Sequence, residues 1–199
     1  MLLTTGQAAA ELGCAITTFR RLISAGVLPG LARRGVRVMV PLDVVQALRT
    51  REHPRLDQLP STEIAVLRVD AARRTDEPER SWIGFAGTLL PEDLLKALRG
   101  WWRCDAESVA AGGVLPVTVS GYVVAVLTGL ERWEKNSKGR HAFPDARLAG
   151  YVTDLAAPHI SITSSLDSDR RLAGLLLGTR LASHSGGAIA YVTTHTTAR

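Results

Sequence analysis

Cysteine is scarce in this chain, which has only Cys14 and Cys104, far apart in the sequence. Neither has a CxxC partner or the ligand spacing of a zinc site, so we expect no metal site. We also expect no bound cofactor, because no cofactor-binding motif stands out. Two isolated cysteines fit a reducing, cytoplasmic setting.

Long apolar runs are missing as well, since none approaches the roughly 18 residues that suggest a membrane span. The longest candidate, residues 114–130, is interrupted by Pro116 and Gly121 and favours buried strand. The N-terminus lacks the charged and apolar segments of a signal peptide. We therefore expect no membrane partner.

Positive charge is concentrated at one end of the chain. Residues 1–55 hold eight arginines and three acidic residues, a net charge of +5. Residues 56–199 hold sixteen basic and sixteen acidic residues and are neutral. A cationic part joined to a neutral part suggests that the first part meets a polyanion. A basic, solvated surface explains the same count equally well.

The first helix is expected just after Thr4, whose hydroxyl can accept a free backbone N–H. Thr4 and Gln7 have the spacing of a capping box. Ala8 and Leu12 fit a buried face, and Gly13 suits the left-handed conformation that often ends a helix.

A second helix is expected from about residue 16 to residue 25, before the Gly-Val-Leu-Pro-Gly stop. Its apolar stripe has helical spacing and consists of Phe19, Leu22 and Ile23. Its outward face is polar and cationic and consists of Thr17, Thr18, Arg20, Arg21 and Ser24. Such a helix fits the major groove of DNA, although a surface helix with two solvated arginines has the same pattern.

A basic hairpin and a third helix are expected next. Residues 33–37 read Arg-Arg-Gly-Val-Arg and precede an apolar run, which indicates two strands with a turn near Gly35. Arginines at such a tip can follow phosphates or enter a minor groove. Pro41 and Asp43 open the third helix, with Val44, Val45 and Leu48 turned inward.

This order resembles the excisionase and MerR-like winged helix-turn-helix family of DNA-binding domains. The resemblance covers about 47 of the 199 residues and rests on the threonine cap, the Leu-Gly helix end, the Gly-Val-Leu-Pro turn and the arginine-rich hairpin. It implies phosphate contacts from Thr4 and Thr5. It implies recognition-helix contacts from Thr17, Thr18, Arg20 and Arg21. It implies wing contacts from Arg33, Arg34 and Arg37.

Four positions depart from the family pattern. Ala15 stands where the recognition helix usually has a serine or threonine cap, and Ile16 replaces a polar or basic residue. Val36 and Met39 stand where the wing usually has glycine or arginine. The resemblance therefore supports affinity for DNA more than base specificity.

The rest of the chain predicts an α+β fold with a mostly antiparallel sheet in residues 63–199, after a proline-containing linker at residues 51–62. Strands are expected at residues 64–69, 81–86, 160–163 and 189–193, and one bent strand or two strands at residues 114–130. Helices are expected from Pro91 to about Gly100 and at residues 170–181, and a charged loop at residues 73–80.

Signals of chemistry in residues 63–199 are weak. Trp101 and Trp102, at an expected helix end, suggest either a stacking platform or one core and one half-exposed side chain. Residues 133–141 combine a tryptophan with basic residues and favour a solvated loop. The Ser183–Gly187 segment lacks a P-loop lysine and favours a hairpin turn. No histidine has the spacing of a known catalytic site, so we expect no enzyme.

The sequence therefore predicts a sequence-directed protein that binds double-stranded DNA, and a transcriptional regulator in particular. A DNA-binding domain of about 50 residues makes few contacts, so we expect a homodimer or higher homo-oligomer. Two alternatives stay open: an architectural factor in excision, recombination or plasmid partition, and a DNA-directed enzyme with a catalytic C-terminal part. The hypothesis requires that Arg20 and Arg21 do not lie beneath the C-terminal part.

Overall fold

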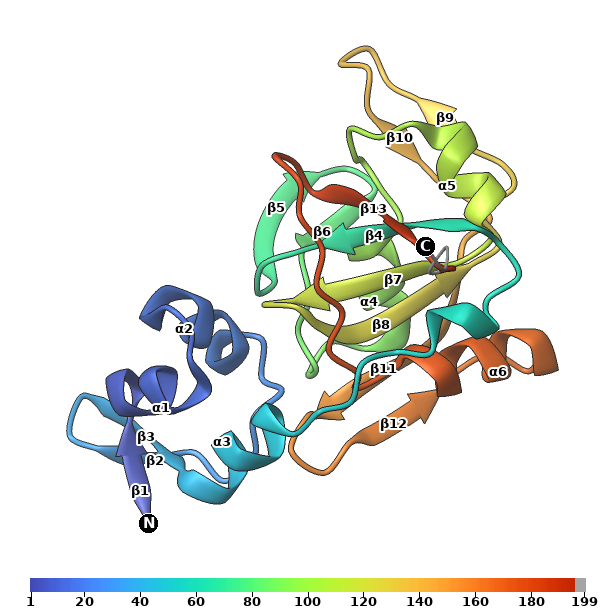
Figure 1. Cartoon of the computed structure of the whole chain (residues 1–199). Coiled ribbons are helices and arrows are strands. Elements are labelled where there is room, and N and C mark those ends of the chain that lie inside the picture. Colours follow the sequence, from blue (N-terminus) through green and yellow to red (C-terminus); the bar gives the residue numbers. More distant parts are fainter. Residues whose placement is uncertain (196–199) are drawn as a thin grey trace.

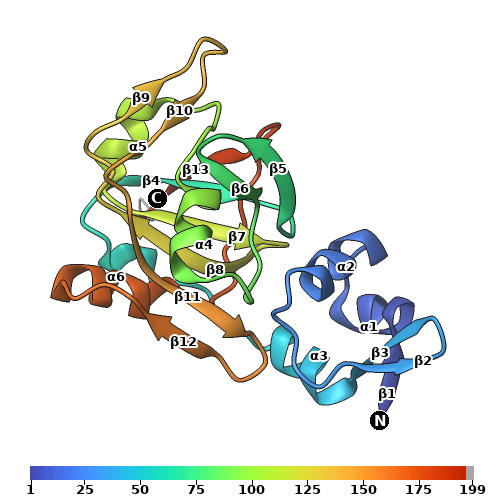
Figure 2. The same cartoon turned by 180° about the vertical axis from the view of Figure 1, so that it is seen from behind.

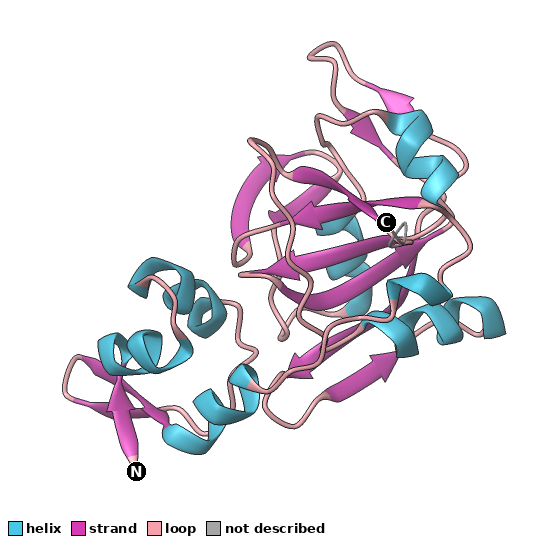
Figure 3. Cartoon of the chain, viewed as in Figure 1, coloured by secondary structure: helices cyan, strands magenta, loops and turns pink. Residues whose placement is uncertain are grey.

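The computed structural model describes residues 1–195 and shows a mixed α+β protein with two lobes (Figure 1). We call residues 1–50 the N-terminal module. Its elements are β1 (Leu2–Thr4), α1 (Thr5–Leu12), α2 (Ile16–Ser24), β2 (Ala32–Arg34), β3 (Arg37–Pro41) and α3 (Leu42–Arg49). Residues 63–195 form the second lobe, the C-terminal region, and Figure 3 shows that most of the strands lie there.

The first helix forms as its sequence predicts. The Thr4 hydroxyl accepts a hydrogen bond from the Gln7 backbone N–H at 3.3 Å, and the Gln7 side chain accepts one from the Thr4 N–H at 2.9 Å. This is a capping box, and it satisfies two free backbone donors. Gly13 ends α1 with a φ of 72°. The Ala8 and Leu12 side chains are buried.

The second helix buries its apolar stripe, since Phe19 and Leu22 are fully buried and Ile23 is half-buried. Ala15 precedes this helix and provides no side-chain cap, in line with its departure from the family pattern. The missing cap leaves first-turn N–H groups of α2 without a side-chain acceptor at that position.

The expected hairpin is present and is part of a larger sheet. Strands β2 and β3 pair antiparallel, with Arg34 opposite Arg37 and a turn at Gly35, whose φ is 59°. Strand β1 pairs with the other side of β3 and gives the order β1-β3-β2, which the sequence does not predict. Figures 1 and 2 show the hairpin tip on the side of the module that points away from the C-terminal region.

The C-terminal region is built on a six-stranded sheet with the order β12-β11-β8-β7-β4-β13. Only β4 and β7 pair parallel, so the expectation of a mostly antiparallel sheet is confirmed. Its strands are β4 (Glu63–Arg68), β7 (Leu115–Val119), β8 (Tyr122–Thr128), β11 (Arg147–Asp154), β12 (His159–Ile162) and β13 (Ile189–Thr193). Helix α4 (Pro91–Leu98) lies across one face of this sheet (Figure 2).

The charged segment at residues 73–80 is not a loop as expected. Most of it forms β5 (Arg73–Glu77), which pairs with β6 (Arg80–Ile83) and places Arg74 opposite Trp82. The Arg74 guanidinium lies 4.6 Å from the centre of the Trp82 ring. Because β5 is polar on both faces, it has none of the apolar alternation by which a strand is recognised.

The helix expected at residues 170–181 is α6 (Asp167–Leu176), so both predicted ends are wrong. Asp167 and Asp169 occupy its first turn, where carboxylates complement the helix dipole. The chain leaves the helix at Leu177 and turns at Gly178, whose φ is 73°.

Four further features differ from the sequence-based expectations. Helix α5 (Ala106–Gly112), capped by the Asp105 carboxylate, and strand β11 were not predicted. The Ser183–Gly187 segment is a loop that leads into β13 rather than a hairpin turn, because β13 pairs with β4. Residues 133–141 contain β9 (Glu134–Lys135), which pairs with β10 (His141–Ala142), so the expected loop is a short hairpin.

The segment between the lobes is packed rather than loose. It contains the short 3-10 helix η1 (Leu56–Gln58), and Leu59 is buried. Glu52 accepts a backbone hydrogen bond from Arg180 at 2.8 Å. Apolar side chains of both lobes join in one continuous core cluster, so the packing of each lobe supports the position of the other.

Candidate nucleic-acid interface

The N-terminal module has a concave surface where α1, α2 and the hairpin meet. We call it the basic groove, and its volume is about 570 Å³. Its lining includes Thr4, Thr5, Arg20, Ser24, Val36 and Arg37. The helix pair supplies one wall and the start of β3 supplies the other, so residues more than 30 positions apart in sequence share one surface.

The two threonines of the groove are held in place by local hydrogen bonds. The Thr4 hydroxyl donates to the Gln7 side-chain oxygen at 3.0 Å. The Thr5 hydroxyl lies 3.5 Å from the Val38 carbonyl, which links α1 to the hairpin. Both residues are partly exposed. Their position at the start of α1, whose first turn has no acidic residue, favours an anion.

Four arginines around the groove have no carboxylate partner. Arg20 projects from α2, and Arg33, Arg34 and Arg37 lie on the hairpin; all four are exposed. Within residues 1–195, no carboxylate lies within ion-pair distance of any of these four guanidinium groups. Their charge is therefore uncompensated by direct pairing, which is the electrostatic pattern of a surface that meets a polyanion.

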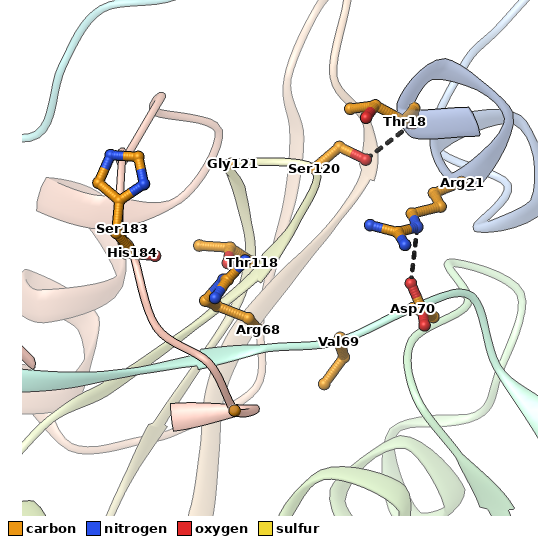
Figure 4. Close-up of a pocket in the computed structure, with 11 residues that line it drawn as sticks. Thr18, Arg21, Arg68, Val69, Asp70, Thr118, Ser120, Gly121, Ser183 and His184 are labelled. Atoms are coloured by element: carbon orange, nitrogen blue, oxygen red, sulfur yellow. Dashed lines mark hydrogen bonds and ion pairs between the residues drawn. The ribbon is translucent and has the colours of Figure 1, made fainter. Parts of the chain in front are cut away.

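The other side of α2 faces the C-terminal region. The Arg21 Nε lies 2.8 Å from the Asp70 carboxylate, and the Ser120 hydroxyl donates to the Thr18 carbonyl at 2.8 Å (Figure 4). Thr17 stays exposed. Of the nine residues predicted from the family resemblance, four line the basic groove, namely Thr4, Thr5, Arg20 and Arg37. Thr18 and Arg21 are directed at the second lobe instead.

Arg21 is engaged but not covered, because 53% of its side-chain surface remains exposed. Arg20 lies in the basic groove and makes no ion pair with the C-terminal region. The DNA-binding hypothesis requires that neither Arg20 nor Arg21 lies beneath the C-terminal region. Arg20 meets this requirement in full. Arg21 satisfies it only in part.

Backbone contacts fix the position of the module. Ala25 accepts a hydrogen bond from the Gly87 N–H at 2.9 Å, and Val27 accepts one from the Leu155 N–H at 3.0 Å. A Cβ atom at Gly87 would lie 3.2 Å from the Gly26 carbonyl oxygen, so the close approach favours glycine there.

A second concavity, which we call the junction cleft, lies between the two lobes and has a volume of about 420 Å³. Arg21 and Thr18 line it from α2. Arg68, Asp70, Ser120 and His184 are among the residues that line it from the C-terminal region (Figure 4). Sequence reasoning missed Asp70 and Ser120, because a single carboxylate after a strand and a single serine in a turn carry no recognisable pattern.

The tryptophan pair has a structural explanation. Neither residue lies on a helix, because α4 ends at Leu98, which corrects the expected helix-end position. The Trp102 Nε1 donates to the Leu98 carbonyl at 2.8 Å, and the Trp101 Nε1 donates to the Glu79 carboxylate at 2.9 Å. Both indole donors are therefore satisfied within the chain.

The Cys104 Sγ lies 3.9 Å from the His141 Nδ1. A thiol next to an imidazole is one arrangement in which a cysteine is activated as a nucleophile. Burial raises the pKa of Cys104 to about 11, and the Asp105 carboxylate adds to this rise. A thiol with this pKa is protonated near neutral pH, so it is a poor nucleophile.

Among residues 1–195, no three His, Cys, Asp or Glu side chains gather as they would around a metal ion. None of the helices in the same part of the chain has the length and apolarity needed to cross a bilayer.

Comparison with known proteins gave no match to a family model, to a curated protein or to a solved structure.

Proposed function

We propose that this protein binds double-stranded DNA through the basic groove and the β2–β3 hairpin, in the manner of a winged helix-turn-helix. The observation that carries the proposal is the set of four exposed arginines without carboxylate partners, Arg20, Arg33, Arg34 and Arg37. A solvated surface would more often intersperse both signs of charge.

One side of α2 lines the basic groove and the other faces the C-terminal region, so only the first side is free to enter a major groove. The accessible edge of α2 carries Thr17, Arg20 and Ser24, all exposed. Arg20 is the one long donor on this edge that can reach a guanine. Arg21 contributes only when its ion pair with Asp70 opens, so we assign it a secondary role.

The hairpin would act on the neighbouring phosphates or in a minor groove. Its tip carries Arg33, Arg34 and Arg37 around the turn at Gly35, and Val36 at the tip is fully exposed. Arginines can enter a narrow minor groove, where the negative potential is enhanced. The same hairpin points away from the C-terminal region, so duplex DNA can approach it without meeting the second lobe.

The direct test is fluorescence anisotropy of the full chain with labelled duplex DNA at low ionic strength. We expect saturable binding that weakens steeply as salt is added, because bound arginines release counterions from the phosphates. Absence of binding at low ionic strength would contradict the proposal.

Transcriptional regulation is the role that we propose for this binding, with two copies of the chain on two half-sites. A footprint on genomic DNA tests the role separately from the binding. A short palindromic footprint is expected. A long cooperative footprint would assign an architectural role instead, and cleavage of the DNA in the presence of a divalent metal would assign an enzyme.

A further inference from the structure

The junction cleft has the size of a ligand site. Its volume of about 420 Å³ falls within the range of small-molecule pockets. Its walls come from α2, from the ends of β4 and β7, and from the loop before β13. Four segments that are distant in sequence thus converge on one concavity.

Hydrogen-bond donors dominate the cleft. Arg68 is at the end of β4, and one of its terminal nitrogens donates to the Ser185 carbonyl at 2.7 Å. Arg21 contacts Asp70 through its Nε. A guanidinium group carries five N–H donors, so each arginine has donors left for a ligand. The cleft is also lined by Thr118, which pairs with Arg68 across the parallel strands β4 and β7.

The charge in the cleft selects the sign of the ligand. The cleft is lined by two guanidinium groups, those of Arg21 and Arg68, and by one carboxylate, Asp70, which pairs with Arg21. His184 lies at the same cleft (Figure 4). The excess of positive charge disfavours a cation and favours an anion. Two planar guanidinium groups match the oxygens of a carboxylate or phosphate better than those of a neutral ligand.

The β7–β8 turn forms part of the wall of the cleft. Ser120 has a φ of 53°, which is unusual for a residue other than glycine, and it forms the β7–β8 turn together with Gly121. Its hydroxyl bridges to the Thr18 carbonyl on the opposite lobe. A positive φ at both Ser120 and Gly121 is the geometry of a two-residue hairpin turn, so the turn fixes where this hydroxyl lies.

We propose that the junction cleft binds a small anionic molecule that carries a carboxylate or phosphate group, with Arg68 as its principal donor and Arg21 as its second. The anion competes with Asp70 for Arg21. The inference of anion binding depends only on the residues of the junction cleft. A resulting change in DNA affinity rests additionally on the proposed function, because Arg21 belongs to α2.

The test is a titration of the full ¹⁵N-labelled chain at constant ionic strength. Inorganic pyrophosphate is the phosphate probe and succinate is the carboxylate probe. We expect saturable binding of at least one probe, with amide shifts at Gly121 and Gly187 in the cleft and none at Gly35 on the hairpin. The probe that binds more tightly identifies the anionic group.

Variants separate the cleft from the hairpin. Arg68→Gln should weaken binding at least about tenfold, because it removes the charged donor. Arg21→Gln, on an exposed helix position, should weaken it about threefold and supplies the test if Arg68→Gln does not fold. The charge-matched control, Arg34→Gln on the hairpin, should leave binding unchanged.

Three results of the titration would overturn the inference. They are the absence of saturable binding by either probe, equal binding by the parent and Arg68→Gln, and shifts confined to the hairpin. A loss of DNA affinity in Arg68→Gln without any small anion present would also overturn it, since a DNA phosphate would then occupy the cleft. Anion binding without DNA binding would keep the cleft and remove the proposed function.

Discussion

Arg21 on α2 forms an ion pair with Asp70, which lies just beyond β4, at a distance of 2.8 Å. The pair joins the helix proposed to read DNA to the lobe that has no counterpart in the family resemblance. Both side chains are more than half exposed, so the pair is held weakly and can exchange partners. This makes Asp70 a competitor of DNA phosphates for the same guanidinium group.

The competition predicts that Asp70→Asn strengthens DNA binding. Removing the carboxylate frees Arg21 and removes a negative charge near the duplex, so we expect about threefold tighter binding at low salt. Fluorescence anisotropy of the parent and the variant measures the change. Adding Arg21→Gln to Asp70→Asn should cancel most of the gain.

The matched control for this prediction is Asp76→Asn, which removes an exposed carboxylate from β5 of the same lobe. It changes the net charge equally but leaves Arg21 paired. An equal gain in both single variants would assign the effect to net charge and would reject the competition between Asp70 and DNA.

The hairpin arginines should affect DNA of any sequence. We expect the combined change Arg33→Ala and Arg37→Ala to weaken binding to all duplexes and to lower the salt slope by about two, about one for each lost phosphate contact. Arg20→Ala should instead reduce the preference among sequences. Binding isotherms over a range of salt concentrations distinguish the two effects.

A charge-matched control for the hairpin variant is available in the C-terminal region. Arg103 and Arg171 are exposed, and neither forms an ion pair within residues 1–195. Replacing both with alanine should leave the salt slope unchanged. A slope that falls equally in both double variants would place the DNA contacts elsewhere than on the hairpin.

The sequence predicted the local structure of the module because its signals are short-range. The Thr4–Gln7 capping box, the Gly13 helix end and the hairpin turn at Gly35 each depend on a few adjacent residues. The strand pairing of β1 depends on β3, more than 30 residues later, and had no local signal. Prediction therefore succeeded where chain neighbours decide the structure.

The junction of the lobes could not be predicted for the same reason. Asp70 and Ser120 have no pattern of their own, and their contacts with Arg21 and Thr18 span 49 and 102 positions of sequence. The outward face of α2 is polar, as its sequence predicts. Nothing in that polarity indicates that one edge would face a second lobe.

Tyr122 tests how strongly the module is attached. Its buried hydroxyl donates to the Leu48 carbonyl of α3 at 3.1 Å. We expect Tyr122→Phe to lower the free energy of unfolding by about 1 kcal/mol, the net value of one hydrogen bond. Urea unfolding measures this change. Tyr151→Phe is the control, because Tyr151 is half-buried and its hydroxyl makes no hydrogen bond within residues 1–195. A similar loss of stability in this control would mean that the Tyr122 hydrogen bond is not the cause.

The lowered pKa of Asp169 predicts how the stability of the C-terminal region depends on pH. Burial alone would raise the pKa of Asp169, but hydrogen bonds from Arg147 at 3.1 Å and Ser164 at 2.7 Å outweigh it and lower the pKa. A carboxyl with a lowered pKa in the folded state binds fewer protons there than in the unfolded chain. Its stabilising effect is therefore complete above the unfolded pKa of about 3.9 and is lost as pH falls through the folded pKa.

The variant Asp169→Asn should remove this dependence. At pH 7 we expect it to lower the free energy of unfolding by about 1 to 2 kcal/mol, a value reduced because the Arg147 side chain is 46% exposed. The gap between parent and variant should close as the pH falls below about 4, since protonation of Asp169 then weakens the same contacts. Urea unfolding at several pH values follows the gap. Asp167→Asn, at an exposed position of the same helix turn, should show a smaller effect. A gap that stays constant from pH 7 to pH 3 would mean that the Asp169 carboxylate does not supply the stabilisation.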